Sequence, residues 1–106
     1  MSKSDLENQL RFEILALYID QPSIEYKIKG SGRNFRWDFG WEKQKLLVEV
    51  QGGTWMDKSG HNTGGGLHRD YEKNNLAVLH GYRVLYFDAE MIKSGVAIQT
   101  IKEVLE

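Results

Sequence analysis

Two acidic residues stand inside apolar, strand-forming stretches of this chain. Asp38 lies within Phe35–Trp41, and Glu49 lies eleven residues further on, within Leu46–Gln51. Acids are normally excluded from such strands, because burying a charge without a partner is costly. A short turn over residues 42–45 would join the two strands and bring both carboxylates to the same end of one sheet. Carboxylate oxygens suit Mg²⁺, so an Asp followed after ten residues by Glu-x-Gln predicts metal-dependent phosphodiester chemistry.

The length and composition are those of one small folded domain. We place a single domain over residues 1–106, because a chain of 106 residues has room for one core. The hydrophobic share of 41% argues against disorder, and the absence of cysteine excludes disulfides and thiol catalysis. There is no signal-peptide apolar run and no segment near the ~20 apolar residues of a membrane span. We therefore expect a cytoplasmic protein without a membrane partner.

The charge pattern favours local rather than bulk contact with nucleic acid. A net charge of −1 at pH 7 argues against coating nucleic acid electrostatically, but only the local field matters at an enzyme site. Basic residues gather before Asp38 and again after Glu49, which predicts phosphate contacts, with solvated surface faces as the alternative. These residues are Lys27, Lys29, Arg33, Arg36, His61, His68, Arg69 and Lys73.

Hydrophobic periodicity predicts an α/β fold with the order αβββαβα. A helix capped by Ser2 or Ser4 is expected over 3–20, before Pro22, and an alternating strand over 24–28. The two acid-bearing strands follow, and then come a helix over 67–80 stopped by Gly81, a strand over 82–87 and a helix over 95–105. We expect three antiparallel strands and a fourth that returns through a helix, giving a four-stranded mixed sheet flanked by helices.

A glycine-rich loop and the start of the following helix carry further candidate nucleic-acid contacts. His61 in the loop could contact a phosphate or move a proton near neutral pH, or be merely exposed. His68 and Arg69 open the helix, where free N–H groups and the helix dipole favour anions. Trp55 is a candidate base-stacking side chain. Arg36 belongs to the basic cluster before the first acid.

This order of elements, with five short motifs along it, resembles the PD-(D/E)XK nuclease superfamily, which has the restriction-endonuclease-like fold. The likeness covers almost the whole chain. It is greatest to small phage and bacterial members related to very-short-patch-repair endonucleases. The motifs are Arg36-Trp37-Asp38-Phe39, Leu46 to Gly53, His61 with Gly64 to Gly66, Asp70 to Asn74, and Gly81 to Phe87.

The resemblance implies a Mg²⁺ or Mn²⁺ cofactor held by catalytic carboxylates. Asp38 and Glu49 would be the first two ligands, and the Val50 carbonyl a third. Relatives also place a glutamate of the first helix at the metal. We expect this to be Glu13, with Glu7 ranked second. The alternatives are ion pairs: Asp38 with Arg36 or Arg33, Glu49 with a helix lysine, and Glu13 with Arg11 or Lys27.

Gln51 departs from the family pattern, which usually has lysine at this position. Glutamine can hydrogen-bond the attacking water but cannot supply positive charge. Some branches of the superfamily carry glutamine here and recruit a basic residue from the following helix. We expect Lys73 to take that catalytic role. Pairing with a neighbouring acid is the alternative for Lys73.

These observations together predict an endodeoxyribonuclease that hydrolyses phosphodiester bonds in DNA, with branched or structured DNA as a possible substrate in replication, recombination or repair. A domain of this size grips little duplex alone, so we expect a homodimer or a larger complex. One alternative is a non-catalytic nuclease-fold module that binds nucleic acid. The other is a protein-binding domain that uses exposed aromatic residues.

Overall fold

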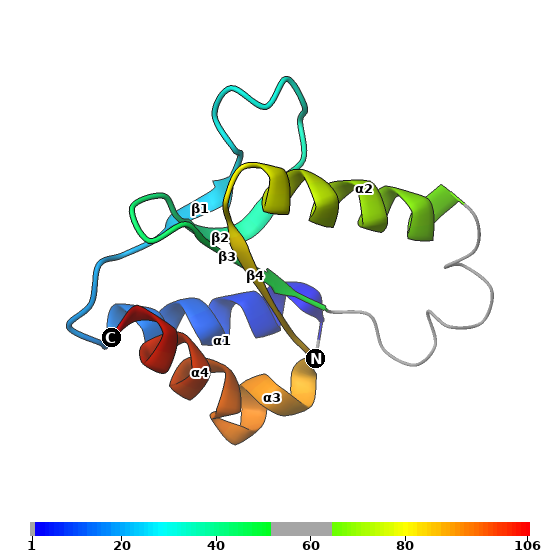
Figure 1. Cartoon of the computed structure of the whole chain (residues 1–106). Helices are drawn as coiled ribbons and strands as arrows, with labels where there is room; N and C mark the ends of the chain where they lie inside the picture. Colours follow the sequence, from blue (N-terminus) through cyan, green and yellow to red (C-terminus); the bar gives the residue numbers. More distant parts are fainter. Residues whose placement is uncertain (1, 52–64) are drawn as a thin grey trace.

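The computed structural model describes residues 2–51 and 65–106, and the side chains of all of these except residues 65–67 (Figure 1). The chain runs through four helices and four strands in these ranges. In order they are α1 (Lys3–Leu15), β1 (Ser23–Tyr26), β2 (Trp37–Trp41), β3 (Leu46–Val50), α2 (Gly65–Leu79), β4 (Arg83–Phe87), α3 (Ala89–Ser94) and α4 (Val96–Leu105).

The four strands form one mixed sheet in the order β1-β2-β3-β4. β1 pairs antiparallel with β2, and β2 pairs antiparallel with β3. β4 lies parallel to β3 after the return through α2. The predicted fold class is therefore confirmed.

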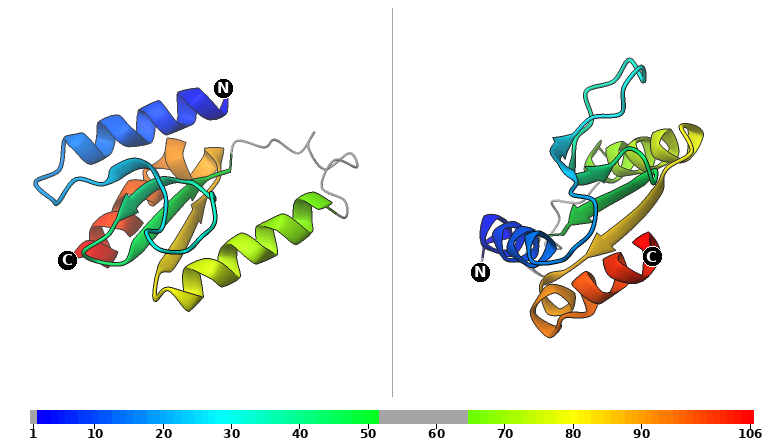
Figure 2. Two further views of the ribbon diagram at one scale, coloured as in Figure 1. Left: turned by 90° about the horizontal axis from the view of Figure 1, so that it is seen from above. Right: turned by 90° about the vertical axis from the view of Figure 1, so that its left-hand side faces the viewer.

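Helices cover both faces of the sheet, as Figure 1 and Figure 2 show. α1, α3 and α4 lie on one face, where a large apolar cluster includes Leu10 of α1, Phe39 of β2 and Ile101 of α4. α2 lies on the other face, over a smaller cluster that includes Trp37, Leu47 and Tyr82. The sheet is thus buried on both sides, and polar groups within β2 and β3 need internal partners.

The helix prediction was wrong at the end of the first helix and in omitting a short helix, and both differences have local causes. The first helix ends at Leu15 rather than Asp20. The side-chain amide of Gln21 donates to the carbonyls of Ile14 and Ile19, both at 3.2 Å, and so stabilises the non-helical segment that follows. The short helix α3 was not predicted. Asp88 caps it by accepting a hydrogen bond from the Met91 amide at 2.9 Å.

Within residues 2–51 and 65–106, none of the helices combines the length and the apolar character needed to cross a membrane.

Candidate active site

Asp38 and Glu49 interlock at the end of β2 and β3. The backbone amide of Asp38 donates to Oε1 of Glu49 at 3.2 Å, and the amide of Val50 donates to Oδ2 of Asp38 at 2.7 Å. Each carboxylate therefore accepts an N–H group from the neighbouring strand. These bonds compensate part of the cost of placing acids in strands. The two acids therefore lie together at one end of the sheet, as the sequence predicted.

The two acids nevertheless belong to different sides of the sheet. Trp37 packs in the cluster under α2, whereas Phe39 packs in the cluster with α1. Because side chains alternate along a strand, Trp37 and Phe39 should lie on the same face of the sheet. They lie on opposite faces, so the alternation is interrupted at Asp38. The Asp38 carboxylate contacts α1, while Glu49 contacts α2.

On the α1 side, Asp38 lies in a cluster of three carboxylates. One oxygen from each of Glu7, Glu25 and Asp38 lies within 4.8 Å of the others. Asp38 is buried, Glu7 is half-buried and Glu25 is exposed. A cavity of about 300 Å³ adjoins them, lined also by Ser4, Asn8 and Arg11 of α1. The donor set consists of hard oxygens that open onto solvent, which fits a divalent cation such as Mg²⁺.

Glu25 has an unusual backbone conformation at this cluster. It lies opposite Asp38, because Ile24 pairs with Phe39 and Tyr26 with Trp37. Its φ of 54° is in the left-handed region, which costs free energy for a residue other than glycine. Such outliers are concentrated at functional sites, and this one lies where a third carboxylate approaches Asp38.

Lys3 lies between two of these carboxylates. Its Nζ is 3.0 Å from Oδ1 of Asp38 and 3.3 Å from Oε2 of Glu7. Burial lowers the pKa of Lys3, but the two acids outweigh burial and the pKa is raised. The ammonium group thus offsets part of the negative charge of the cluster.

Burial also opposes ionisation of Asp38, but hydrogen bonds outweigh it. The partners are the Glu7 carboxyl, the Val50 amide and Lys3, and together they hold the pKa of Asp38 below its usual range. The pKa of Glu7 is shifted in the opposite direction, because burial and the neighbouring Asp38 raise it. The pair therefore favours an ionised Asp38 beside a Glu7 that takes up a proton more readily.

On the α2 side, Glu49 pairs with Lys73, whose Nζ donates to Oε2 of Glu49. Both side chains are largely buried, with exposed fractions of 16% for Lys73 and 17% for Glu49. The Lys73 ammonium also lies 5.1 Å from the centroid of the Trp37 ring. Burial raises the pKa of Glu49 and the Asp38 carboxylate adds to this effect, while Lys73 acts against it without cancelling it.

Gln51 is exposed just beyond β3, where its backbone N–H donates to the Phe87 carbonyl at 2.8 Å. It lines a cleft of about 290 Å³ together with Glu49 and Lys73. The structure therefore places Lys73 beside Glu49 and Gln51, as expected for a lysine recruited from the helix. The same contact is also the ion pair that was the alternative for Glu49.

The helix-one glutamate beside Asp38 is Glu7, not Glu13. A helix turns by about 100° per residue, so Glu7 and Glu13 lie on opposite flanks of the buried stripe of α1. Glu13 is half-buried, and its Oε1 finds no hydrogen-bond partner among the described residues. Spacing along the chain did not separate the two glutamates. Glu25 and Lys3 were missed altogether, because only the register of β1 and the packing of α1 bring them to Asp38.

The predicted nucleic-acid contacts are partly described. Arg36 and Arg69 line one cleft next to Lys73, and His68 is exposed, with Nε2 3.4 Å from Glu72. The residues His61 and Trp55 lie outside the described residues. The Val50 amide is engaged by Asp38, and the role of the Val50 carbonyl as a ligand stays a prediction.

Comparisons with known proteins give one informative match. No family model matches the chain, and no curated protein does so. Among solved structures, the chain is similar to the catalytic domain of the homing endonuclease I-Bth0305I, with a TM-score of 0.62 and 16% sequence identity. The similarity covers 98% of this chain and 93% of that domain. At this identity, the match establishes that the two chains share a fold over nearly their whole length.

Proposed function

We propose that this protein is a metal-dependent endodeoxyribonuclease of the PD-(D/E)XK type. The observation that carries the proposal is the interlocked pair of Asp38 and Glu49, with a buried lysine held on Glu49 beside Gln51. Two acids and one lysine at the end of neighbouring strands are the set that metal-dependent phosphodiester hydrolysis needs. The fold shared with a homing endonuclease catalytic domain supports the same reaction class.

The carboxylates fit Mg²⁺ or Mn²⁺ by the chemistry of their donors. Asp38 would hold the cation with Glu7 and Glu25 from one side of the sheet, and Glu49 lies next to it on the other side. The chemistry supplied by such a cation is neutralisation of phosphate charge and activation of a water molecule. Lys3, which bridges Asp38 and Glu7, would have to move aside.

The residues around Glu49 would position the attacking water molecule and stabilise the negative charge that develops on the phosphate. Lys73 supplies the positive charge that Gln51 lacks, at a point where water is largely excluded and charge acts strongly. Gln51 can orient a water molecule through its side-chain amide. The substrate would be DNA. A homodimer or a larger complex would supply the grip that a domain of this size lacks.

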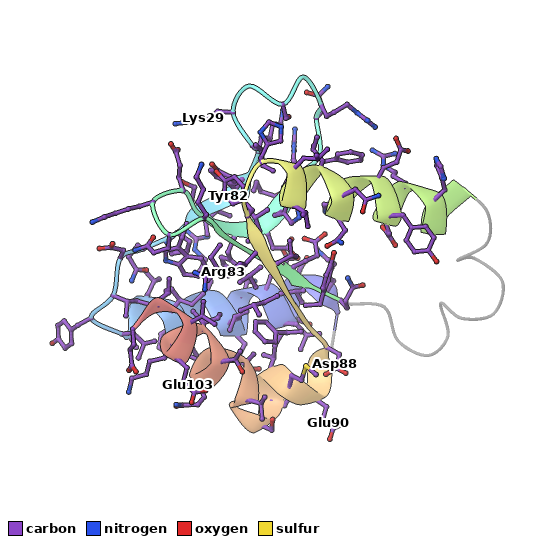
Figure 3. The ribbon with its side chains drawn as sticks, in the orientation of Figure 1. Lys29, Tyr82, Arg83, Asp88, Glu90 and Glu103 are labelled. Atoms are coloured by element: carbon purple, nitrogen blue, oxygen red, sulfur yellow. The ribbon has the colours of Figure 1, made fainter. Side chains whose placement is uncertain are left out.

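Cleavage of labelled DNA tests the proposal. A panel of single-stranded, duplex, nicked, flapped and four-way-junction DNA is incubated with Mg²⁺, Mn²⁺ or EDTA. We expect cation-dependent cutting that falls by on the order of 10²–10³-fold in Asp38→Asn and Glu49→Gln. Glu103→Gln is the matched control, because Glu103 extends from α4 on the face away from α2 (Figure 3). A folded wild-type protein that cuts nothing with either cation would overturn the proposal.

A second function, a non-catalytic module that binds nucleic acid, is favoured by one observation. Each of the two acids has a lysine within ion-pair distance, Lys3 for Asp38 and Lys73 for Glu49. Such a module would bind DNA equally well in EDTA and Mg²⁺. Its affinity would also be unchanged in Asp38→Asn, whose cutting activity the first proposal expects to be lost.

A further inference from the structure

A basic cleft lies between the segment before β2 and the helix α2. It measures about 430 Å³ and is lined by Asn34, Phe35, Arg36, Arg69, Asp70 and Lys73. The lining residues come from two segments far apart in the sequence. The cleft lies on the α2 side of the sheet, because Phe35 packs in the cluster under that helix.

Phe35 forms the base of a cation–π arrangement at this cleft. The guanidinium carbon of Arg33 is 4.5 Å from the centroid of its ring, and that of Arg69 is 5.7 Å from it. Phe35 itself is buried, so the ring is a fixed support. Attraction to the ring face restricts where the guanidinium groups lie and prepares them for a ligand.

The charges at the cleft are not all neutralised. Glu72 pairs with Arg33 at 3.3 Å. In the part of the chain that the structure describes, no carboxylate is within ion-pair distance of Arg36 or Arg69. Asp70 lines the cleft and brings one negative charge to it. Two guanidinium groups are therefore available to an anion, with one acid nearby that repels it.

The basic cleft continues into the candidate active site. Asp70 and Lys73 line both this cleft and the neighbouring one that contains Glu49 and Gln51. Lys73 spans the boundary, because its side chain reaches Glu49. An extended anion lying in the basic cleft would thus arrive at the acid pair.

We propose that this cleft is the track along which the backbone of one DNA strand reaches Glu49 and Lys73. The inference rests on the proposed function and adds to it the direction from which substrate enters. Arg36 and Arg69 would each contact a phosphate, which guanidinium groups recognise through paired N–H donors. Phe35 is a positioning residue, which acts by holding Arg69. The small net charge of the chain makes such a local track the main source of electrostatic attraction.

Binding measured without cleavage tests the track. Fluorescence anisotropy of labelled duplex and single-stranded DNA is recorded in EDTA over a range of NaCl concentrations. Arg36→Ala and Arg69→Ala should each weaken binding on the order of tenfold. Each should also lower the slope of log affinity against log salt by about 0.9, the value for one lost phosphate contact on duplex DNA. Asp70→Asn should strengthen binding, because it removes a repulsive charge.

Lys102→Ala is the matched control, since this exposed lysine lies on α4 behind the opposite face of the sheet. Binding by the two arginine variants that matches the control in affinity and slope would overturn the track. Phe35→Leu tests positioning. It should lower the salt slope as Arg69→Ala does, and the double variant should lose no more than Arg69→Ala alone. An unchanged slope in folded Phe35→Leu would remove Phe35 from the proposal.

The two proposals fail separately. Wild-type protein that binds DNA through these arginines but does not cut it contradicts the nuclease and leaves the track standing. Cutting that is lost in Asp38→Asn, together with binding that ignores Arg36 and Arg69, contradicts the track and leaves the nuclease standing.

Discussion

The two acids at the end of β2 and β3 are neighbours, yet their surroundings differ. Asp38 lies on the side of α1 among two further carboxylates, and its cationic partner Lys3 is 47% exposed. Glu49 lies on the side of α2, where among the described residues it is paired with Lys73 alone, and the Lys73 side chain is 16% exposed. On the α1 side a buried Asp38 meets partners that are exposed or half-buried, whereas on the α2 side both members of the ion pair are largely buried.

This difference sets the two pKa values in opposite directions. Hydrogen bonds hold the pKa of Asp38 low despite burial, whereas burial raises the pKa of Glu49 despite Lys73. Two acids with divergent pKa values are typical of sites where one acid stays ionised and the other handles protons. Under the proposed function, Asp38 would then bind the cation and the Glu49–Lys73 pair would act around the reacting phosphate.

The largest expected difference between the two halves is in stability. Lys73→Met should lower the free energy of unfolding by about 3 kcal/mol at neutral pH, because it leaves Glu49 charged and poorly hydrated. Lys3→Met should lower it by less, about 1 kcal/mol, because the Lys3 ammonium is exposed and the buried Asp38 keeps its hydrogen bond from the Val50 amide. Methionine keeps most of the apolar stem in both cases. Urea unfolding measures both values.

Lys102→Met controls for the loss of an exposed lysine. Equal losses in the Lys3 and Lys73 variants would break the comparison, since they would mean that the Glu49 pair is as hydrated as the Asp38 cluster.

The fold and the acid pair could be predicted from the sequence, because both depend on local patterns. An acid between apolar residues in a strand, such as Glu49 between Val48 and Val50, is visible without a structure. The short turn over residues 42–45 predicted that Asp38 and Glu49 lie at the same end of the sheet, and the Asp38 amide does donate to Glu49 there. The ion pair of Glu49 with a lysine of the next helix had been the alternative to metal binding, and Lys73 makes this contact.

The α1 half of the site was less predictable, because it depends on packing between distant segments. Whether Glu7 or Glu13 faces Asp38 is decided by the rotation of α1 on the sheet, and a helix carries acids on both flanks of its apolar stripe. Glu25 lies opposite Asp38 through the register of β1 with β2, and its left-handed backbone conformation is one that its residue type does not favour. Lys3 stands at a chain end, where sequence gives no indication of a long-range partner.

The pH dependence of stability should separate the two acids, because their pKa values are shifted in opposite directions. The pKa of Asp38 is lowered from 3.8, so its stabilising effect is present above pH 3.8 and is lost as pH falls through the lowered value. The pKa of Glu49 is raised from 4.5, so its effect is present below pH 4.5 and is lost as pH rises through the raised value.

Urea unfolding of metal-free protein across pH checks this expectation. Asp38→Asn should reduce the loss of stability on acidification, and Glu49→Gln should reduce the loss as the pH rises from 4.5. Glu103→Gln serves as the control on α4. If both site variants changed the same limb of the pH profile, the two environments would not differ in the way described.

The smallest expected effect concerns which half of the site takes the cation. The Lys3 ammonium occupies the carboxylates of Asp38 and Glu7, so a divalent cation must displace it. Lys3→Met should therefore tighten Mn²⁺ binding by up to about fivefold, the equivalent of one solvent-exposed ion pair. Isothermal titration calorimetry of the folded variant against wild type measures this change without any need for cleavage.

The same titration of Lys73→Met makes the comparison sharper. A cation held mainly by Asp38, Glu7 and Glu25 should bind that variant as it binds wild type, because Lys73 contacts only Glu49 within the acid group. Tighter binding in both lysine variants would instead show that the cation lies between Asp38 and Glu49 and competes with both ammonium groups. An unchanged affinity in Lys3→Met would mean that Lys3 is not a competitor, and that the open carboxylate cluster on α1 is a structural ion pair.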